Sequence, residues 1–160
     1  MKPKTSPLRA RNGGPGSQGS APRTLTFMIP GEARAKARPQ VRSFAGRPQI
    51  YKDRVTATYE NWVRLHAEDA LGDAPRFEGP VAMCIEVITE PAKSHSARKR
   101  KDMIEGRIKP TRYPDLDNVV KSVIDGCSRS TIRDDVLVVA ITASKAYGER
   151  AATFVSIAEV

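Results

Sequence analysis

One stretch decides how this chain is organised: YPDLDNVVKSVIDG at residues 113–126, followed a few residues later by RDD at 133–135. Pro114 disfavours helical backbone at Tyr113, so a boundary is expected there. Beyond it, apolar residues recur at the spacing of one helix face; they are Val119, Val120, Val123, Ile124 and Cys127. The stretch is therefore predicted to be a loop followed by a helix that packs on a sheet.

Aspartates and one lysine in this stretch are spaced for a common site. Asp115 or Asp117 lies at or near the predicted N-cap, where a short carboxylate accepts backbone N–H groups. Lys121 lies four residues after Asp117, and Asp125 four after Lys121, so they share one edge of the helix. Taken alone, this pattern is typical of a capped helix braced by ion pairs, each worth about 0.2–0.5 kcal/mol.

A second acidic pair favours a metal site over simple capping. Asp134 and Asp135 lead into VLVVAI at 136–141, an apolar run typical of a buried strand. A strand packed beside the helix could bring these acids back towards Asp115 and Asp117. Gathered carboxylates repel one another unless a cation neutralises them, and Mg²⁺ prefers such oxygen ligands. A zinc site is not indicated, because the two His and two Cys lie at unrelated spacings.

These residues resemble the signature of the RusA family of Holliday junction resolvases. The likeness lies in PDLDNVVKSVID at 114–125 and in the Asp-Asp pair at the head of a strand, with support from PAKSHSARKRK at 91–101 and from residues 31–39. It implies a Mg²⁺-dependent endonuclease, with Mn²⁺ able to substitute, that acts as a homodimer on four-way DNA junctions. It further implies symmetric paired nicks with 5′-phosphate and 3′-hydroxyl ends, and no organic cofactor.

The resemblance also implies roles for individual residues. Asp115, Asp117 and Asp135 match the metal-binding catalytic acids, and Lys121 matches the catalytic lysine. Asp125 matches a further family aspartate. Asp134 is adjacent to the inferred ligand and is the alternative to Asp135. The connection GCSRST at 126–131 departs from the family's usual apolar or Asn-Gly connection, which affects where Asp135 lies relative to the other acids.

Composition limits the class of protein and its partners. The 160 residues carry 27 Lys and Arg against 18 Asp and Glu, a net charge of +9, which favours a polyanionic partner. Residues 1–22 hold no acid and are rich in Pro and Gly, so they are predicted to be a disordered basic tail before a folded domain at 23–160. The sequence contains no run of about 18 apolar residues, so no membrane span is predicted. A bacterial or phage-encoded cytoplasmic protein is expected, with Cys84 and Cys127 as buried free thiols.

Two basic segments are predicted to bind the DNA backbone. The first, Glu32–Lys52, is predicted to be a long loop, because its prolines and glycine exclude a regular helix. The second, at 93–112, leads directly into the acidic stretch, although a charge run is often only a solvated helix face. The residues predicted to contact DNA are Arg34, Lys36, Arg38, Arg42, Arg98, Lys99, Arg100, Lys101, Lys109 and Arg112.

The remaining pattern predicts an α/β protein of the α+β type, with a single mixed sheet and two main helices in the order β-α-β-α-β-β. Strands are predicted at 24–29, 81–88, 136–143 and 152–157. The first helix is predicted at 53–71, with Asp53 as N-cap and Gly72 as stop. Its residues expected on one side are Val55, Tyr59, Trp62, Val63, Leu65, His66 and Ala70.

Two other functions fit part of the sequence. In a non-catalytic DNA-binding module the acids would only cap and brace a helix. In a nucleotide-sugar transferase an Asp-x-Asp pair would hold metal and diphosphate, but the basic excess would then have no explanation. DNA binding explains that excess through counterion release.

Overall fold

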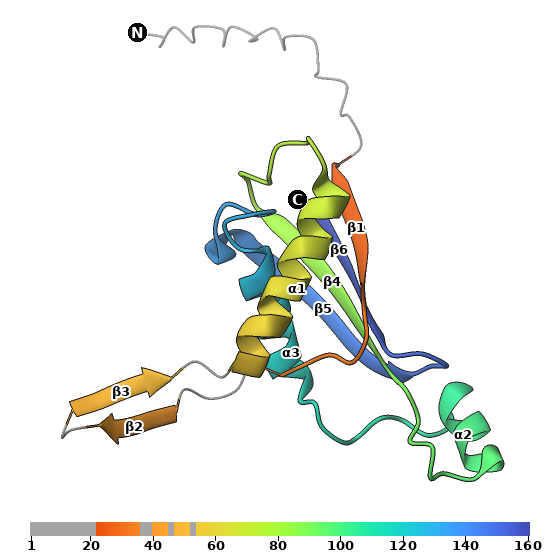
Figure 1. Ribbon diagram of the computed structural model, residues 1–160. Coiled ribbons are helices and arrows are strands. Elements are labelled where there is room, and N and C mark those ends of the chain that lie inside the picture. The colour runs from red at the N-terminus through yellow and green to blue at the C-terminus, as the bar shows by residue number, and fades with distance from the viewer. Residues whose placement is uncertain (1–21, 36–39, 45–46, 52–53) are drawn as a thin grey trace, which may run out of the picture.

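A mixed four-stranded sheet forms one layer of the computed structural model, which describes residues 22–35, 40–44, 47–51 and 54–160 (Figure 1). Its strand order is β1-β6-β4-β5, and β5 is parallel to β4 while the other neighbours are antiparallel. The predicted α+β class with a main mixed sheet is confirmed. The strands are β1 (Thr24–Pro30), β4 (Val81–Thr89), β5 (Val138–Tyr147) and β6 (Ala152–Glu159).

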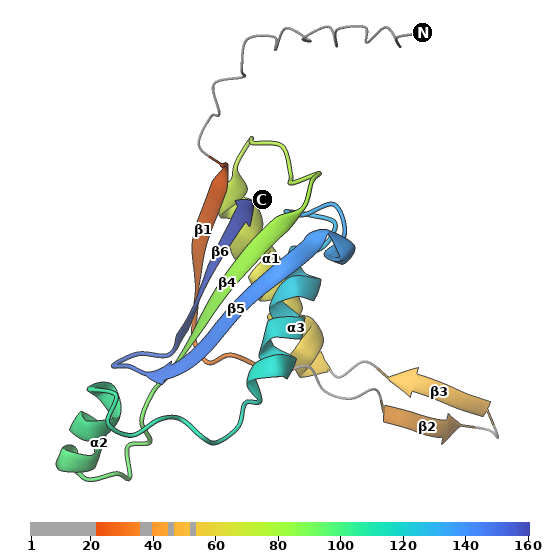
Figure 2. The same ribbon diagram turned by 180° about the vertical axis from the view of Figure 1, so that it is seen from behind.

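Two helices, α1 (Arg54–Leu71) and α3 (Leu116–Cys127), cover one face of this sheet and leave the other face open (Figures 1 and 2). A shorter helix, α2 (Ala97–Ile104), lies beyond the end of the sheet, and a 3-10 helix, η1 (Asp135–Leu137), precedes β5. The main elements follow the predicted order β1, α1, β4, α3, β5, β6.

The core lies between the helices and the sheet. Tyr59, Val63 and Ala67 form the buried stripe of α1, each four residues from the next. This stripe belongs to one cluster with the buried apolar side of α3 and with alternate sheet residues; they include Val119, Val123, Cys127, Met83, Ile85, Val155 and Ile157. Burying this apolar surface is the main favourable contribution to folding. The core therefore fixes α3, and with it the acidic stretch, on the sheet.

The predicted buried side of the first helix is too wide. Trp62 and Leu65 are 43% and 51% exposed, and Ala70 is exposed as well. A strict four-residue spacing gives a narrow stripe, and these side chains lie outside it. Val55 and the predicted N-cap Asp53 fall outside the residues whose side chains are described. Gly72 ends the helix as predicted, with a positive φ of 56°.

The segment predicted as a long basic loop contains a β-hairpin instead. Strand β2 (Gln40–Phe44) pairs antiparallel with β3 (Arg47–Tyr51), and the pair stands away from the main sheet (Figure 1). Pro48 argues against a helix here but not against a strand, because a proline is tolerated in an edge strand, where its missing N–H needs no partner. In a two-stranded sheet both strands are edges.

Two further predictions about burial are wrong. The strand following Asp135 lies at the edge of the sheet, and Val136, Val139 and Ile141 are 75%, 62% and 48% exposed. A strand with one neighbour, partly covered by α3, cannot bury both of its faces. Cys84 is also exposed, because it lies on the open face of β4, whereas Cys127 is buried and burial raises its pKa to about 12.

Candidate metal and nucleic-acid site

The start of α3 presents two acids to solvent. Asp115 occupies the N-cap position with extended backbone, at φ −69° and ψ 129°, but its side chain makes no capping hydrogen bond. Asp117 lies in the first turn, and both side chains are exposed. The helix dipole favours negative charge at this end. The Asp115 carboxylate is therefore placed at an N-terminus without being used by the helix, contrary to the simple capping interpretation.

A lysine from β5 holds the loop before these acids. The Lys145 ammonium donates hydrogen bonds to the carbonyl oxygens of Arg112, at 2.7 Å, and of Pro114, at 3.0 Å. A charged donor makes such bonds stronger than neutral ones. Lys145 was not predicted as a site residue, since nothing in its spacing connects it with the acidic stretch.

Lys121 and Asp125 follow along α3. Lys121 is exposed, and Asp125 is partly buried. Together with Asp117 they lie at successive four-residue steps, so the predicted charged edge of the helix is present. The opposite side of α3 holds the buried residues Val119 and Val123.

The second acidic pair has a different local role. The Asp134 carboxylate accepts the Val136 N–H at 3.2 Å and so caps η1. The pKa of Asp134 is held below its usual range, first by that bond and then by a side-chain hydrogen bond with Asp135. The charges of Arg129 and Arg133 lower it further. Asp135 begins η1 and is exposed. Of the two acids that the sequence could not separate, Asp134 is the one already engaged by the backbone.

The two acidic groups lie at opposite ends of the α3–β5 layer. Lys145, near the end of β5, holds Pro114 before α3, while Asp135 comes just before the first residue of β5, Val138. The seven residue steps from Val138 to Lys145, at about 3.3 Å each, correspond to roughly 23 Å. In Figure 1, η1 lies at the upper end of this layer and α3 begins at its lower end.

The expectation that β5 returns its leading acids to Asp115 and Asp117 is therefore wrong within one chain. Across the described ranges, 22–35, 40–44, 47–51 and 54–160, no group of three or more His, Cys, Asp or Glu side chains could hold a metal ion. The reason is geometric, because β5 starts where α3 ends and runs back along it. The donor set of a single chain does not fit a three-carboxylate metal site.

Basic side chains lie in the segment that precedes Asp115 in the chain. Four exposed cations form no ion pair with any carboxylate that the structure describes; they are Arg98, Lys99, Lys109 and Arg112. Lys101 pairs with Glu105 at 3.8 Å, Arg34 pairs with Glu32 at 3.6 Å, and Arg100 is partly buried. The side chains of the other predicted DNA contacts, Lys36, Arg38 and Arg42, lie outside the description.

The surroundings of His95 include cations from two parts of this basic segment. Its pKa is lowered, first by desolvation and then by the charges of Lys99 on α2 and Arg112 before α3. Positive charges that lie close together without a counterion are typical of a surface that binds an anion. In the sequence, only the Lys and Arg residues of this segment were predicted to bind DNA, and His95 was not among them.

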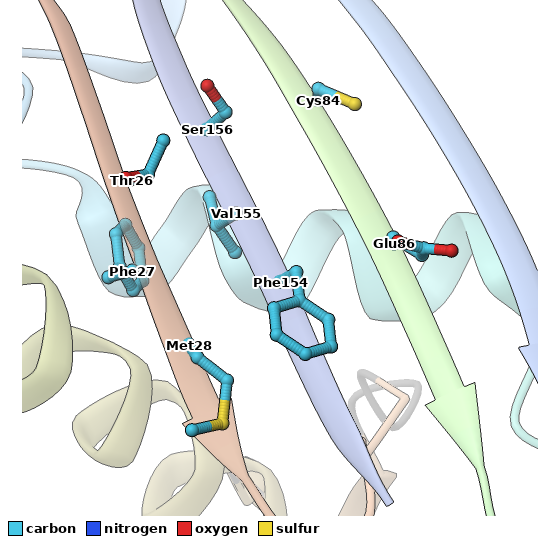
Figure 3. Close-up of a pocket in the computed structure, with 8 residues that line it drawn as sticks. All are labelled: Thr26, Phe27, Met28, Cys84, Glu86, Phe154, Val155 and Ser156. Carbon is cyan, nitrogen blue, oxygen red and sulfur yellow. The ribbon is translucent and has the colours of Figure 1, made fainter. Parts of the chain in front are cut away.

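A hollow of about 440 Å³ lies on the open face of the sheet, away from this site (Figure 3). Its floor is made of cross-strand neighbours, with Thr26 beside Ser156 and Met28 beside Phe154. Glu86 is its one charged residue, and no basic side chain lines it. It therefore suits neither DNA phosphate nor the proposed chemistry of the acids.

Comparison with known proteins gives the family of this α+β chain. The family described as endodeoxyribonuclease RusA matches residues 30–158, and the chain belongs to that family. It is also 32% identical over 138 residues to the uncharacterized protein YqaN of Bacillus subtilis (strain 168), a match covering 85% of this chain and 96% of YqaN. Within the described residues, none of the helices has the length and apolar character needed to cross a membrane.

Proposed function

We propose that this protein is a divalent-metal-dependent endonuclease that resolves four-way DNA junctions by symmetric paired nicks, leaving 5′-phosphate and 3′-hydroxyl ends. The observation that carries the proposal is the exposed Asp115–Asp117 pair. It directly follows a cationic segment and a loop whose carbonyl oxygens, at Arg112 and Pro114, are bound by Lys145. Membership of the endodeoxyribonuclease RusA family supports it. The metal is proposed to be Mg²⁺, with Mn²⁺ able to substitute, because hard divalent ions prefer carboxylate oxygens.

A homodimer is proposed to complete the metal site. Asp135 lies at the opposite end of β5 from Asp115 and Asp117, so a second copy would bring this acid to them without refolding the described chain. A two-fold axis beside the middle of β5 and perpendicular to the sheet would set the edge strands of two copies antiparallel. The start of one β5 would then lie beside the end of the other, and Asp135 of the partner subunit would approach Asp115 and Asp117.

The surface of β5 supports this mode of association. It is an edge strand whose outer side has no partner strand in the described sheet, and such edges are templates for pairing with another chain. Val139 and Ile141 are exposed beside that edge. Ile141 is level with the core residue Met83, so it points towards the helix side, where α3 of a second copy would cover it.

The other residues have proposed roles in the same site. Lys121, exposed one helical turn from Asp117, would bind a phosphate oxygen at the cleavage position. The cations Arg98, Lys99, Lys109 and Arg112 would hold the DNA backbone, which positions a substrate without reading its sequence. Junction selectivity would follow from the shape of this surface on a two-fold dimer.

A synthetic four-way junction tests the proposal. Incubation with the protein should give paired nicks in Mg²⁺ and in Mn²⁺, and intact junction in EDTA. The four-way junction and a linear duplex of the same sequence are compared, since a structure-specific enzyme should cut only the former. Tight junction binding without cleavage in any divalent ion would contradict the proposal.

The separation of Asp135 from Asp115 and Asp117 within one chain favours one alternative function, a DNA-binding module without catalytic activity. If the chain acts as a monomer, Asp135 stays at the far end of β5 and three carboxylates do not meet. The basic surface would still bind DNA. Sedimentation of the wild-type protein separates the two, because the nuclease requires a dimer at the concentrations at which junctions are cut.

A further inference from the structure

Tyr113 is the most exposed aromatic side chain among the residues whose burial is described, at 65%. Most aromatic rings of this domain contribute to its core or its sheet, as the buried Tyr59 and Phe77 do. Tyr113 instead lies between Arg112 and Pro114, two residues before Asp115. An exposed ring beside a proposed catalytic acid needs a role other than packing.

The backbone that carries this ring is fixed on both sides. The same Lys145 ammonium binds the carbonyl oxygens of Arg112 and Pro114, and Pro114 is itself buried. The ring is therefore exposed on a tethered backbone, in contrast to a side chain on an untethered loop. Holding a contact residue in place before binding reduces the conformational entropy lost when the ligand arrives.

The surroundings identify the kind of ligand. The cations that lower the pKa of His95, namely Lys99 and Arg112, bring phosphate to this part of the surface. Bases inside a linear duplex are stacked and cannot reach a protein ring, but a base at the branch point of an opened four-way junction lacks a stacked neighbour on one face. Aromatic rings beside a cationic groove bind such bases by stacking.

We propose that Tyr113 stacks on an exposed base at the branch point of the DNA, and that Lys145 is the positioning residue that holds it there. This inference rests on the proposed function and adds the residue that distinguishes branched from linear DNA. The ring lies two residues from Asp115, so the stacked base and the cleaved phosphate would be near neighbours.

Binding measurements with Ca²⁺ in place of Mg²⁺ test the role of Tyr113 on uncut DNA. Tyr113→Leu should bind the four-way junction roughly five- to a hundredfold more weakly, the range expected for loss of one stacked base. Its affinity for linear duplex should not change, and Tyr113→Phe should match the wild type. The matched control is Phe154→Leu, an aromatic 46% exposed on the open sheet face, which should change neither affinity. Equal effects of Tyr113→Leu on both DNAs, or no effect, would overturn the proposal.

A junction with 2-aminopurine at the branch point tests the positioning role of Lys145. Stacking on the ring should quench the probe with wild-type protein, and Tyr113→Leu should remove the quenching. Lys145→Met should also reduce the quenching although Tyr113 is present, in protein whose cooperative melting shows that it is folded. Undiminished quenching in Lys145→Met would exclude the positioning role.

The same samples separate this inference from the proposed function. Wild-type protein that never cuts the junction in Mg²⁺ contradicts the nuclease assignment. Wild-type protein that cuts it, while Tyr113→Leu binds and cuts identically, contradicts only the stacking role.

Discussion

The two ends of the α3–β5 layer differ in how they are built. At the beginning of α3, Asp115 and Asp117 are exposed and the preceding loop is held by hydrogen bonds from Lys145. At the other end, Gly126, Cys127 and Ile132 are buried in close packing, and the exposed Asp135 follows. At the first end hydrogen bonds hold the loop while the acids stay exposed to solvent, and at the second end the backbone is fixed by core packing. The difference shows that the described part of a single subunit presents its exposed acids in two separate places, with no group of three that could hold a metal ion.

The proposed dimer would join these two ends. Two-fold association through β5 would bring unlike ends together, so each of two sites would receive acids from both subunits. Substitutions at either end of this layer or at the edge of β5 should therefore have effects of different size, given below from the largest to the smallest.

Asp117→Asn should reduce junction cleavage by about a thousandfold, because losing one metal ligand forfeits several kcal/mol of transition-state stabilisation. Junction binding should stay equal or become tighter, since a carboxylate facing the phosphate has been neutralised. Single-turnover cleavage and equilibrium binding measure the two effects. Asp69→Asn, an exposed aspartate on α1, is the control and should change neither. Weakened binding by Asp117→Asn would instead indicate a structural role.

Ile141→Lys should convert the dimer to monomers and lower cleavage by about a hundredfold at micromolar protein, because a charge at the proposed seam opposes its burial. Sedimentation gives the subunit mass. Phe154→Lys is the matched control, since it is similarly exposed but lies on the open face. Dissociation caused by Phe154→Lys and not by Ile141→Lys would place the interface on the open face.

Gly126→Ala should lower the free energy of unfolding by about 1–3 kcal/mol through overpacking. A Cβ at this position would lie 2.7 Å from Val63 Cβ and 2.8 Å from the Glu60 carbonyl oxygen. The gain in helix propensity, about 1 kcal/mol, is too small to offset this. Urea unfolding measures the change, and Gly79→Ala, whose new Cβ meets nothing within 4 Å, should be neutral.

Junction affinity should rise a few-fold as the pH falls from about 7 to 5.5, since the ordinary histidine pKa is about 6.5. The pKa of His95 is lowered in the free protein, by desolvation and then by Lys99 and Arg112. Bound phosphate offsets those charges, so the complex holds the proton more tightly than the free protein and binding takes up a proton. Calorimetry in buffers of different ionisation enthalpy measures the uptake. His95→Gln should abolish it, and a pH dependence that persists in that variant would assign it to another group.

Much of the fold could be predicted because apolar periodicity is a local signal. Val119, Val123 and Cys127 identify the buried side of α3 by spacing alone, and the alternation in β4 identifies a strand. Exposure was predicted less well, because the run 136–141 is apolar enough for a central strand and only the strand order shows that it is an edge. The pairing of β2 with β3 was missed because the prolines and glycine of this segment exclude a helix, and a loop was predicted although Pro48 is compatible with an edge strand.

The candidate site was predicted residue by residue but not in three dimensions. The sequence identified the acids, yet a helix of 12 residues is about 18 Å long, and a strand that follows it after a short connection must start at its far end. That estimate already separates Asp135 from Asp115. Lys145 and Tyr113 were missed for another reason, since the first acts through a contact between distant residues and the second through its exposure.

The most direct test combines two inactive variants in one dimer. Protomers carrying Asp117→Asn and Asp135→Asn, each with a different affinity tag, are purified together as the heterodimer. If acids are shared between subunits, one site in each heterodimer is intact, and it should nick one strand at about half the wild-type rate and bind half as much Mn²⁺. If all three acids belong to the same subunit, both sites are damaged. A heterodimer no more active than either homodimer would contradict the shared site.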